Sequence, residues 1–140
     1  PGKVFATPGW RVIKDRGSLL IEPVQEAVKP LLEIKEHPYT PDFMIPRNKA
    51  TACFDADKLQ HPLSLRLCRQ GDSFVPFGMK GRKKVSDYLT DRKFSLLRKE
   101  RQWVLCCGDD IIWLVGERVD NRFRIDKKTR KVLVVSTIDQ

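Results

Sequence analysis

The sequence predicts an α+β fold that is mainly β. Many short runs of apolar and β-branched residues are separated by Gly, Pro and Asp, and only two short stretches have the apolar spacing of a helix. With 140 residues, 41% of them hydrophobic, the chain is long enough for one domain with a buried core, alone or with an appended segment. Strands that outnumber helices without alternating with them are typical of the α+β class.

The first clear pattern is that of a β-hairpin. Residues 12–13 and 19–21 are apolar, and the polar stretch between them ends at Gly17. Glycine adopts the positive φ of tight turns at little cost, so we place the turn there.

Residues 22–36 allow two interpretations. Some of their apolar residues have helical spacing, but Pro23 and Pro30 limit any helix to a turn or two. Residues 32–34 could instead begin a strand. Residues 37–46 contain three prolines and are predicted to form an irregular connection.

The middle of the chain predicts two strands and a loop. Residues 51–54 read as a strand, and residues 63–69 alternate between apolar and other side chains, as a half-buried strand does. A turn at residues 70–72 follows. Residues 73–81, with one proline and two glycines, are predicted to be a loop.

The last part predicts both helices and the remaining strands. Helical spacing appears over residues 83–91 and again near residues 96–101. Apolar runs then predict strands at 103–107, 111–115, 122–125 and 132–138, the first two joined as a hairpin by the turn Gly108–Asp110.

Positive charge is concentrated in one quarter of the chain. Residues 64–102 hold eleven Lys and Arg against four Asp and Glu, whereas the residues before them hold nine against eight and those after them seven against six. Most of the net charge of +9 therefore lies there. A local field of this sign suggests a polyanionic partner, most simply nucleic acid.

Residues 78–84, Gly-Met-Lys-Gly-Arg-Lys-Lys, lead directly into the first predicted helix. Glycines let a backbone approach phosphate closely, and cations at a helix N-terminus oppose its dipole unless an anion binds there. We therefore interpret this loop as a phosphate-binding element. Any single cation of the region, taken alone, is explained as well by ordinary surface solvation.

Several functional classes are disfavoured. Cys53, Cys68, Cys106 and Cys107 form no CxxC pair and are expected to be free thiols in a reducing compartment, and neither His has a metal-ligand spacing. Neither a GxxxxGK[ST] loop nor a specific nucleophile–base set is present. No apolar run could span a membrane. We therefore expect no catalytic residue, no metal site and no membrane partner, and a cytoplasmic location.

An ordered series of small motifs resembles the C-terminal domain of bacterial tRNA(Ile)-lysidine synthetase. The series runs from about Leu65 to Ile138: Arg69-x-Gly71-Asp72, then Pro76-x-Gly78-x-x-Gly81-x-Lys83-Lys84-Val85-Ser86-Asp87, then Asp91-x-Lys93, Arg98 and Arg101, and Ile111-Ile112-Trp113-Leu114-Val115-Gly116-x-Arg118. Residues 1–60 resemble the family only loosely. We divide the chain into a strand-bearing lead-in segment (1–62), packed on the domain, and a tRNA-binding domain (63–140).

The resemblance implies a layered β-sandwich with small helices, a fold shared with a domain of the large subunit of phenylalanyl-tRNA synthetase. It also implies a parent enzyme that uses ATP to join lysine to C2 of the wobble cytidine in the isoleucine tRNA with a CAU anticodon. The SGGxDS motif of the catalytic N-terminal domain is absent, and the chain begins at Pro1 without a Met. We therefore expect a fragment that is inactive alone, with ATP, L-lysine and Mg bound by the N-terminal domain outside it.

In the family this domain holds tRNA on the acceptor-stem side. The cations predicted to contact tRNA phosphates are Arg66, Arg69, Lys80, Arg82, Lys83, Lys84, Lys93, Arg98, Arg101 and Arg122. The residues predicted to shape the loops are Gly71, Asp72, Gly78 and Gly81. Cys106 and Cys107 stand where the family more usually has polar or acidic residues. The expected partners are this tRNA and the parent's own catalytic domain.

A second hypothesis assigns the chain to protein interaction. In it, the module orients or dimerises its parent as a homodimer, and the basic face only keeps the domain soluble. Salt-dependent binding of tRNA distinguishes the two hypotheses, because release of counterions from phosphates makes such binding weaken as salt rises.

Overall fold

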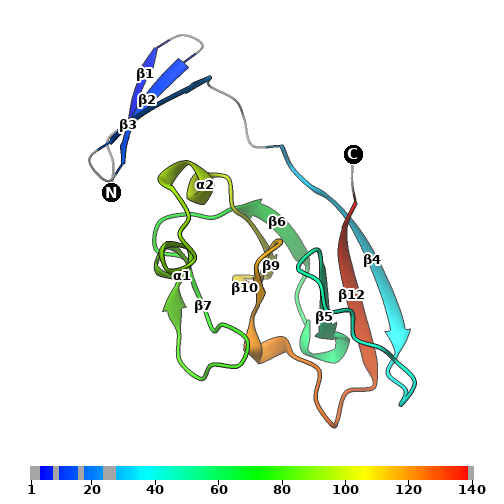
Figure 1. Cartoon of the computed structure of the whole chain (residues 1–140). Coiled ribbons are helices and arrows are strands. Elements are labelled where there is room, and N and C mark those ends of the chain that lie inside the picture. The colour runs from blue at the N-terminus through cyan, green and yellow to red at the C-terminus, as the bar shows by residue number, and fades with distance from the viewer. Residues whose placement is uncertain (1–3, 8–9, 16–17, 24–27, 139–140) are drawn as a thin grey trace.

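The computed structural model describes residues 4–7, 10–15, 18–23 and 28–138, with side chains from residue 28 onward. Within these ranges the protein is mainly β, as predicted. Its longer strands form three antiparallel sheets, and two short α-helices accompany them (Figure 1).

The first sheet comes from the N-terminal strands. Its members are β1 (Val4–Thr7), β2 (Trp10–Asp15) and β3 (Ser18–Pro23). β2 and β3 pair antiparallel with Asp15 opposite Ser18, which confirms the predicted hairpin. The turn predicted at Gly17 lies outside the described residues.

The central sheet has the order β11–β10–β9–β6. Its strands are β6 (Leu63–Leu67), β9 (Trp103–Cys107), β10 (Asp110–Leu114) and β11 (Arg118–Val119). The predicted hairpin between β9 and β10 is present, and Gly108 in its turn has φ +58°. A β-bulge at Ile112 interrupts the register, which places Ile112 and its neighbour Trp113 in the same core.

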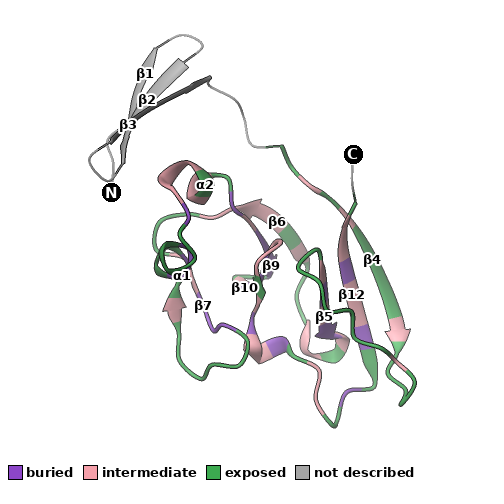
Figure 2. Cartoon of the chain, in the orientation of Figure 1, coloured by how far each residue is buried: buried purple, intermediate pink, exposed green. Residues whose placement is uncertain are grey.

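The domain is layered, with the central sheet in the middle. On one face the helix α1 (Val85–Asp91) buries Val85, Tyr88 and Leu89 against β9 and β10. On the other face the sheet β4–β12–β5 contributes Ala52, Phe54 and Val135. Alternation along β9 makes this possible, because Val104 and Cys106 face α1 whereas Leu105 and Cys107 face the second sheet. Figure 2 shows buried residues on both sheets.

The sheet β4–β12–β5 shows which of the two interpretations of residues 22–36 holds for residues 32–34. Its strands are β4 (Leu31–Pro38), β12 (Lys131–Ile138) and β5 (Thr51–Asp55). Residues 32–34 are thus strand, and the irregular connection begins only after Pro38. β12 pairs with β4 on one side and β5 on the other, so strands before and after residue 62 share one sheet. The domain boundary at residue 62 stays a prediction.

Two predicted elements are wrong. Residues 73–81 are not entirely loop, because β7 (Ser73–Phe74) pairs with β8 (Lys83–Lys84), and the first helix begins at Val85 rather than Lys83. Residues 122–125 are not a strand. The 3₁₀ helix η2 (Asn121–Phe123) replaces it, because the Asp120 side chain accepts the Arg122 N–H and starts a helical turn.

Candidate nucleic-acid interface

The junction between β8 and α1 displays part of the basic loop. Ser73 lies opposite Lys84 in the β7–β8 pair, so Arg82 and Lys84 point to one face of it, and Arg82 Nη1 donates to Ser73 Oγ at 3.0 Å. Lys84 is the N-cap residue of α1 and makes no capping bond with its side chain. The buried Val85 anchors the junction on the core, which leaves Arg82 and Lys84 exposed.

The turn before β7 is tied to the same junction. Gly71 has φ +89°, and Asp72 C=O accepts the Val85 N–H at 2.9 Å. The Asp72 carboxylate accepts bonds from Arg66 Nη1 at 2.8 Å, Arg66 Nη2 at 3.0 Å and the Arg69 N–H at 2.7 Å. Partial burial raises the pKa of Asp72, but these donors outweigh it and the pKa falls below its ordinary value. The Arg66–Asp72 pair is therefore a structural clamp.

Three of the ten predicted phosphate contacts are neutralised by carboxylates. Arg66 pairs with Asp72, and Lys83 pairs with Asp91. Arg122 donates to Asp120 and Asp110. An ion pair of this kind cancels most of the field that an arginine or lysine presents to a distant phosphate.

The other predicted cations are exposed. Within the described part of the chain, Arg69, Lys80, Lys84 and Lys93 carry no ion pair. Arg98 lies over the Phe94 ring, with its guanidinium carbon 3.8 Å from the ring centre. Arg101 is also exposed. Two of the four predicted loop-shaping residues, Gly71 and Gly78, have positive φ, whereas Gly81 does not.

Lys99 is a further cation of this region, although it is absent from the predicted contacts. From α2 (Leu96–Glu100) its ammonium donates to Thr90 Oγ1 at 2.5 Å and to Ser86 Oγ at 3.4 Å, both on α1. Because these hydroxyl groups are uncharged, they do not neutralise Lys99. They hold its ammonium group against α1, the helix that Lys84 caps. The sequence does not indicate that the Lys99 side chain reaches from α2 to α1.

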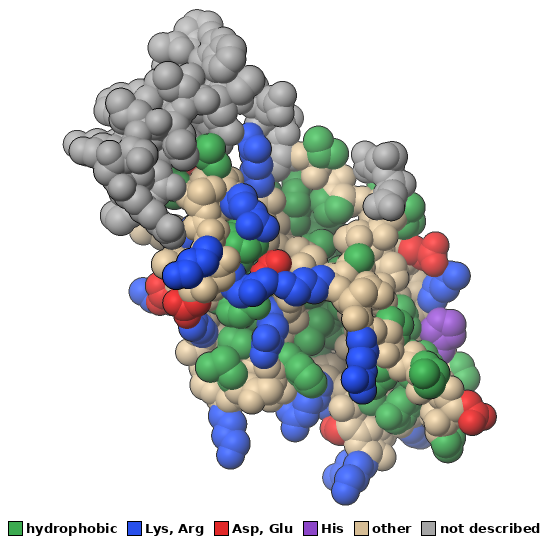
Figure 3. Space-filling model, in the orientation of Figure 1, with side chains coloured by type: hydrophobic (Ala, Val, Ile, Leu, Met, Phe, Trp, Pro, Cys, Tyr) green, Lys and Arg blue, Asp and Glu red, His purple; other side chains and the backbone are tan. Residues whose placement is uncertain are grey.

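Lys and Arg side chains are spread over one face of the molecule. Figure 3 shows them from the part that covers α1 and α2 down to the end formed by residues 121–131, with few Asp and Glu among them. The cations on and next to α1 and α2 are called the basic face below; they are Arg69, Arg82, Lys84, Lys93, Arg98 and Lys99.

Beside the basic face, the loop between β7 and β8 borders a hollow of about 620 Å³. Apolar and cationic side chains line it together with the amide of Asn121; the lining residues are Val75, Phe77, Gly78, Met79, Lys80, Asn121, Arg122 and Arg124. Sequence reasoning missed Phe77, Met79 and Asn121. A loop this short has no alternation of apolar and polar residues, so its sequence does not indicate which apolar side chains stay exposed.

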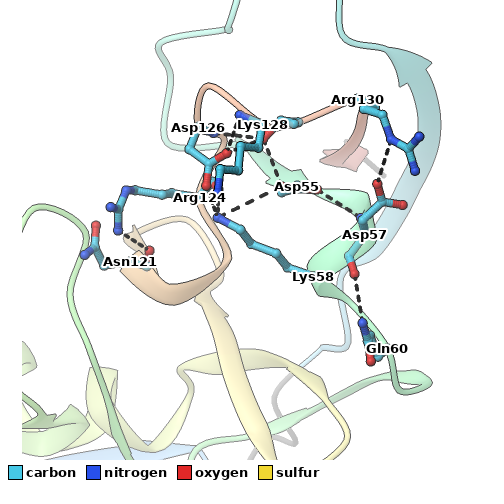
Figure 4. Close-up of polar contacts among 10 residues, drawn as sticks. Asp55, Asp57, Lys58, Gln60, Asn121, Arg124, Asp126, Lys128 and Arg130 are labelled. Carbon is cyan, nitrogen blue, oxygen red and sulfur yellow. Dashed lines mark hydrogen bonds and ion pairs between the residues drawn. The ribbon is translucent and has the colours of Figure 1, made fainter.

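A second polar cluster is structural. Around η1 (Ala56–Lys58), Lys58 Nζ donates to Asp126 Oδ2 at 2.8 Å and to the Arg124 C=O at 2.7 Å (Figure 4). Thr129 Oγ1 donates to the buried Asp55 at 2.9 Å. These bonds hold the loop before β12 against β5. The hydrogen bond from Lys58 lowers the pKa of Asp126.

Over residues 28–138, no group of three or more His, Cys, Asp or Glu side chains is placed to hold a metal ion. The four cysteines are free thiols. No helix in the described part of the chain is long and apolar enough to cross a membrane.

Comparison with known proteins decides the family. The model of the TilS substrate C-terminal domain matches residues 63–136, more than half of the chain. The chain belongs to this family. The matched residues begin at β6 and end within β12, so they include the basic face and the hollow.

Curated relatives carry the name tRNA(Ile)-lysidine synthase. The one from Bacteroides thetaiotaomicron is 58% identical over 99% of this chain, and the one from Parabacteroides distasonis is 48% identical over 97%. The chain spans only about a third of the length of these relatives, 33% and 34% respectively.

Two solved structures share the fold. A crystal structure titled as a TILS C-terminal domain aligns with 78% of this chain and 85% of its own at a TM-score of 0.61 and 19% identity. An N-terminal fragment of the phenylalanyl-tRNA synthetase β-subunit from Pyrococcus horikoshii aligns with 62% of this chain and 27% of its own at 0.53 and 16%. At such identities the likeness shows the fold alone, and it is the layered fold expected from the sequence.

Proposed function

We propose that this domain binds tRNA as a non-catalytic part of a tRNA(Ile)-lysidine synthase. The parent enzyme would use ATP to join lysine to C2 of the wobble cytidine in the isoleucine tRNA with a CAU anticodon. ATP, lysine and Mg would bind to the catalytic domain outside this chain. The family and the names of the curated relatives support the assignment.

The observation that carries the proposal is the set of uncompensated cations on the basic face. Arg69, Lys84 and Lys93 lie exposed, and their side chains form no ion pair with a carboxylate of the described residues. Asp72 accepts the backbone N–H of Arg69 but pairs with the side chain of Arg66, and Asp91 pairs with Lys83. α1 has only seven residues, so its end charge is small and the side chains themselves supply the field. Cations without partners stay available to phosphates.

The contacts we propose are with the backbone of a tRNA helix, on the acceptor-stem side. Proteins recognise A-form RNA mainly through its shape, its phosphates and its 2′-hydroxyls, because its deep major groove excludes side chains. Phosphate contacts position a duplex without reading its sequence. The domain would thus hold the tRNA while another domain performs the chemistry.

A gel-shift experiment tests the proposal. The 140-residue chain is titrated with unmodified isoleucine tRNA carrying the CAU anticodon, and with methionine tRNA, at two salt concentrations. The double variant Arg69→Glu, Lys84→Glu is expected to weaken binding by about tenfold per lost contact. The matched control, Lys35→Glu, Lys131→Glu, makes the same change of net charge on β4 and β12, on the other side of the central sheet from α1, and is expected to bind nearly as the unmodified chain does.

Two outcomes contradict the proposal, and the comparison of the two tRNAs shows how much of the recognition lies in this domain. Equal loss in both double variants would show that net charge matters and the basic face does not. No binding at either salt concentration would favour the hypothesis of a protein-interaction module. Self-association of the chain in solution would then support that hypothesis. Tighter binding of the isoleucine tRNA would place part of the tRNA recognition in this domain, whereas equal binding would limit it to the RNA backbone.

A further inference from the structure

The loop between β7 and β8 exposes two large apolar side chains inside the most basic part of the chain. Phe77 and Met79 are 43% and 45% exposed, although the neighbouring Phe74 and Val75 are buried. Both line the hollow, on either side of Gly78. Apolar side chains held at a surface next to cations point to a ligand that has both an apolar face and a negative charge.

Hydrogen bonds fix the position of this loop tip. The Phe77 C=O accepts Arg118 Nη2 at 2.6 Å, and the Phe77 N–H donates to the Val119 C=O at 3.0 Å. The Asn121 amide accepts the Gly78 N–H at 3.1 Å and donates to the Met79 C=O at 3.1 Å. The backbone that carries Phe77 and Met79 is therefore preorganised, which lowers the entropy cost of binding.

A buried carboxylate supports the floor of the hollow. Asp120 is fully buried and accepts the Val75 N–H at 2.9 Å and the Arg122 N–H at 2.8 Å. The guanidinium of Arg122 also donates to both Asp120 oxygens, each at 3.0 Å. Because Asp120 neutralises Arg122, this arginine holds the floor rather than supplying free charge.

Two cations at the rim keep their charge. Lys80 is exposed and has no ion pair with a described residue. Arg124 is exposed, its Nη1 donates to the Asn121 C=O at 3.1 Å, and it forms no ion pair with a carboxylate of residues 28–138 (Figure 4). Both line the same hollow as Phe77 and Met79.

We propose that this loop tip binds one unpaired nucleotide of RNA, with the base against Phe77 and Met79 and the phosphate facing Lys80 and Arg124. Within a duplex the faces of the bases are already stacked, so only an unpaired or terminal base offers a face to an aromatic side chain. The charge of the rim favours a nucleotide over an apolar protein segment. The inference rests on the proposed function and adds a site that reads single-stranded RNA.

Two RNA hairpins with the same stem test the inference, one with a blunt end and one with a four-nucleotide single-stranded 3′ overhang. The unmodified chain is expected to bind the overhang hairpin about fivefold or more tightly than the blunt one, as one stacked base supplies. Phe77→Ala is expected to remove this preference without changing the affinity for the blunt hairpin. Phe77→Tyr keeps a ring at the same place and is expected to keep the preference.

The double variant Arg69→Glu, Lys84→Glu separates this inference from the proposed function. It is expected to weaken binding of both hairpins by the same factor and to leave their ratio intact. An unmodified chain that binds both hairpins equally, or a Phe77→Ala variant that keeps the preference or weakens both hairpins equally, overturns the nucleotide site while the proposed function stands. An unmodified chain that binds neither hairpin overturns both.

Discussion

Lys93 occupies a backbone position that favours glycine. It directly follows α1 and its capping residue, with φ +67°, and no other non-glycine residue of the described chain has positive φ. The helix end is closed by the Lys93 N–H on the Thr90 C=O and by the Phe94 N–H on the Leu89 C=O, both at 2.9 Å. A side chain in this conformation costs on the order of 1 kcal/mol. An exposed lysine that bears this cost suggests that its charge is used.

Lys93→Gly is expected to stabilise the domain and to weaken its binding of RNA. Removing the side chain relieves the strain at positive φ, which should raise the free energy of unfolding by about 1 kcal/mol. It also removes one cation of the basic face. Urea unfolding measures the first effect, and the gel shift with tRNA measures the second.

Lys93→Gln is the matched control, because it keeps the strained backbone and removes only the charge. It should bind RNA as weakly as the glycine variant does, without the gain in stability. If Lys93→Gly binds tRNA as tightly as the unmodified chain does, Lys93 is not part of the interface.

Residue-level reasoning from the sequence finds the cations but not their partners. Arg66 and Arg69 are three residues apart and look alike in the sequence, yet Arg66 is clamped by Asp72 and Arg69 is exposed. The difference depends on the turn at Gly71, which brings the Asp72 carboxylate back onto β6. Tertiary geometry therefore selects which charges remain available, and no periodicity in the sequence encodes that selection.

At the scale of elements, strands that are long or clearly alternating were predicted well. β6, β9, β10 and β12 lie within two residues of their expected positions. The wrong strand, at residues 122–125, has the right alternation, but four residues are too few to outweigh the capping bond from Asp120. β7 and β8 were missed because each has only two residues, and a pair that short carries no pattern.

The clamp between Arg66 and Asp72 predicts how stability depends on pH. Because the pKa of Asp72 is lower in the folded state than its ordinary value, the unfolded state takes up a proton first as the pH falls. The stabilisation from this carboxylate is therefore fully present above its ordinary pKa and is lost as the pH falls through the lowered one. Asp72→Asn is expected to be less stable at neutral pH and to depend less on pH in the acid range.

Thermal unfolding of both proteins between neutral and acid pH measures this difference. Asp87→Asn serves as control, since Asp87 is an exposed residue of α1. It should follow the unmodified chain at every pH. If the stability of Asp72→Asn falls as steeply with acid as that of the unmodified chain, another carboxylate governs the acid transition.

At the scale of the whole molecule, the distribution of charge is consistent with an RNA partner. Residues 64–102 carry the excess of cations, and the layered fold gathers part of them around α1 and α2 while β4, β5 and β12 lie on the other side of the central sheet (Figure 1). Oriented charge of this kind speeds the encounter with a polyanion and sets its direction.

The salt dependence of binding counts the phosphate contacts. Each cation that neutralises a phosphate contributes about 0.7–0.9 to the slope of log affinity against log salt. Lys84→Gln is expected to lower that slope by about one contact, and Arg66→Gln by much less, because Arg66 is already paired with Asp72. Fluorescence titrations with isoleucine tRNA over a range of salt concentrations give both slopes. A slope for Arg66→Gln that falls as far as that for Lys84→Gln would show that the clamp opens when RNA binds, so that Asp72 releases the arginine to a phosphate.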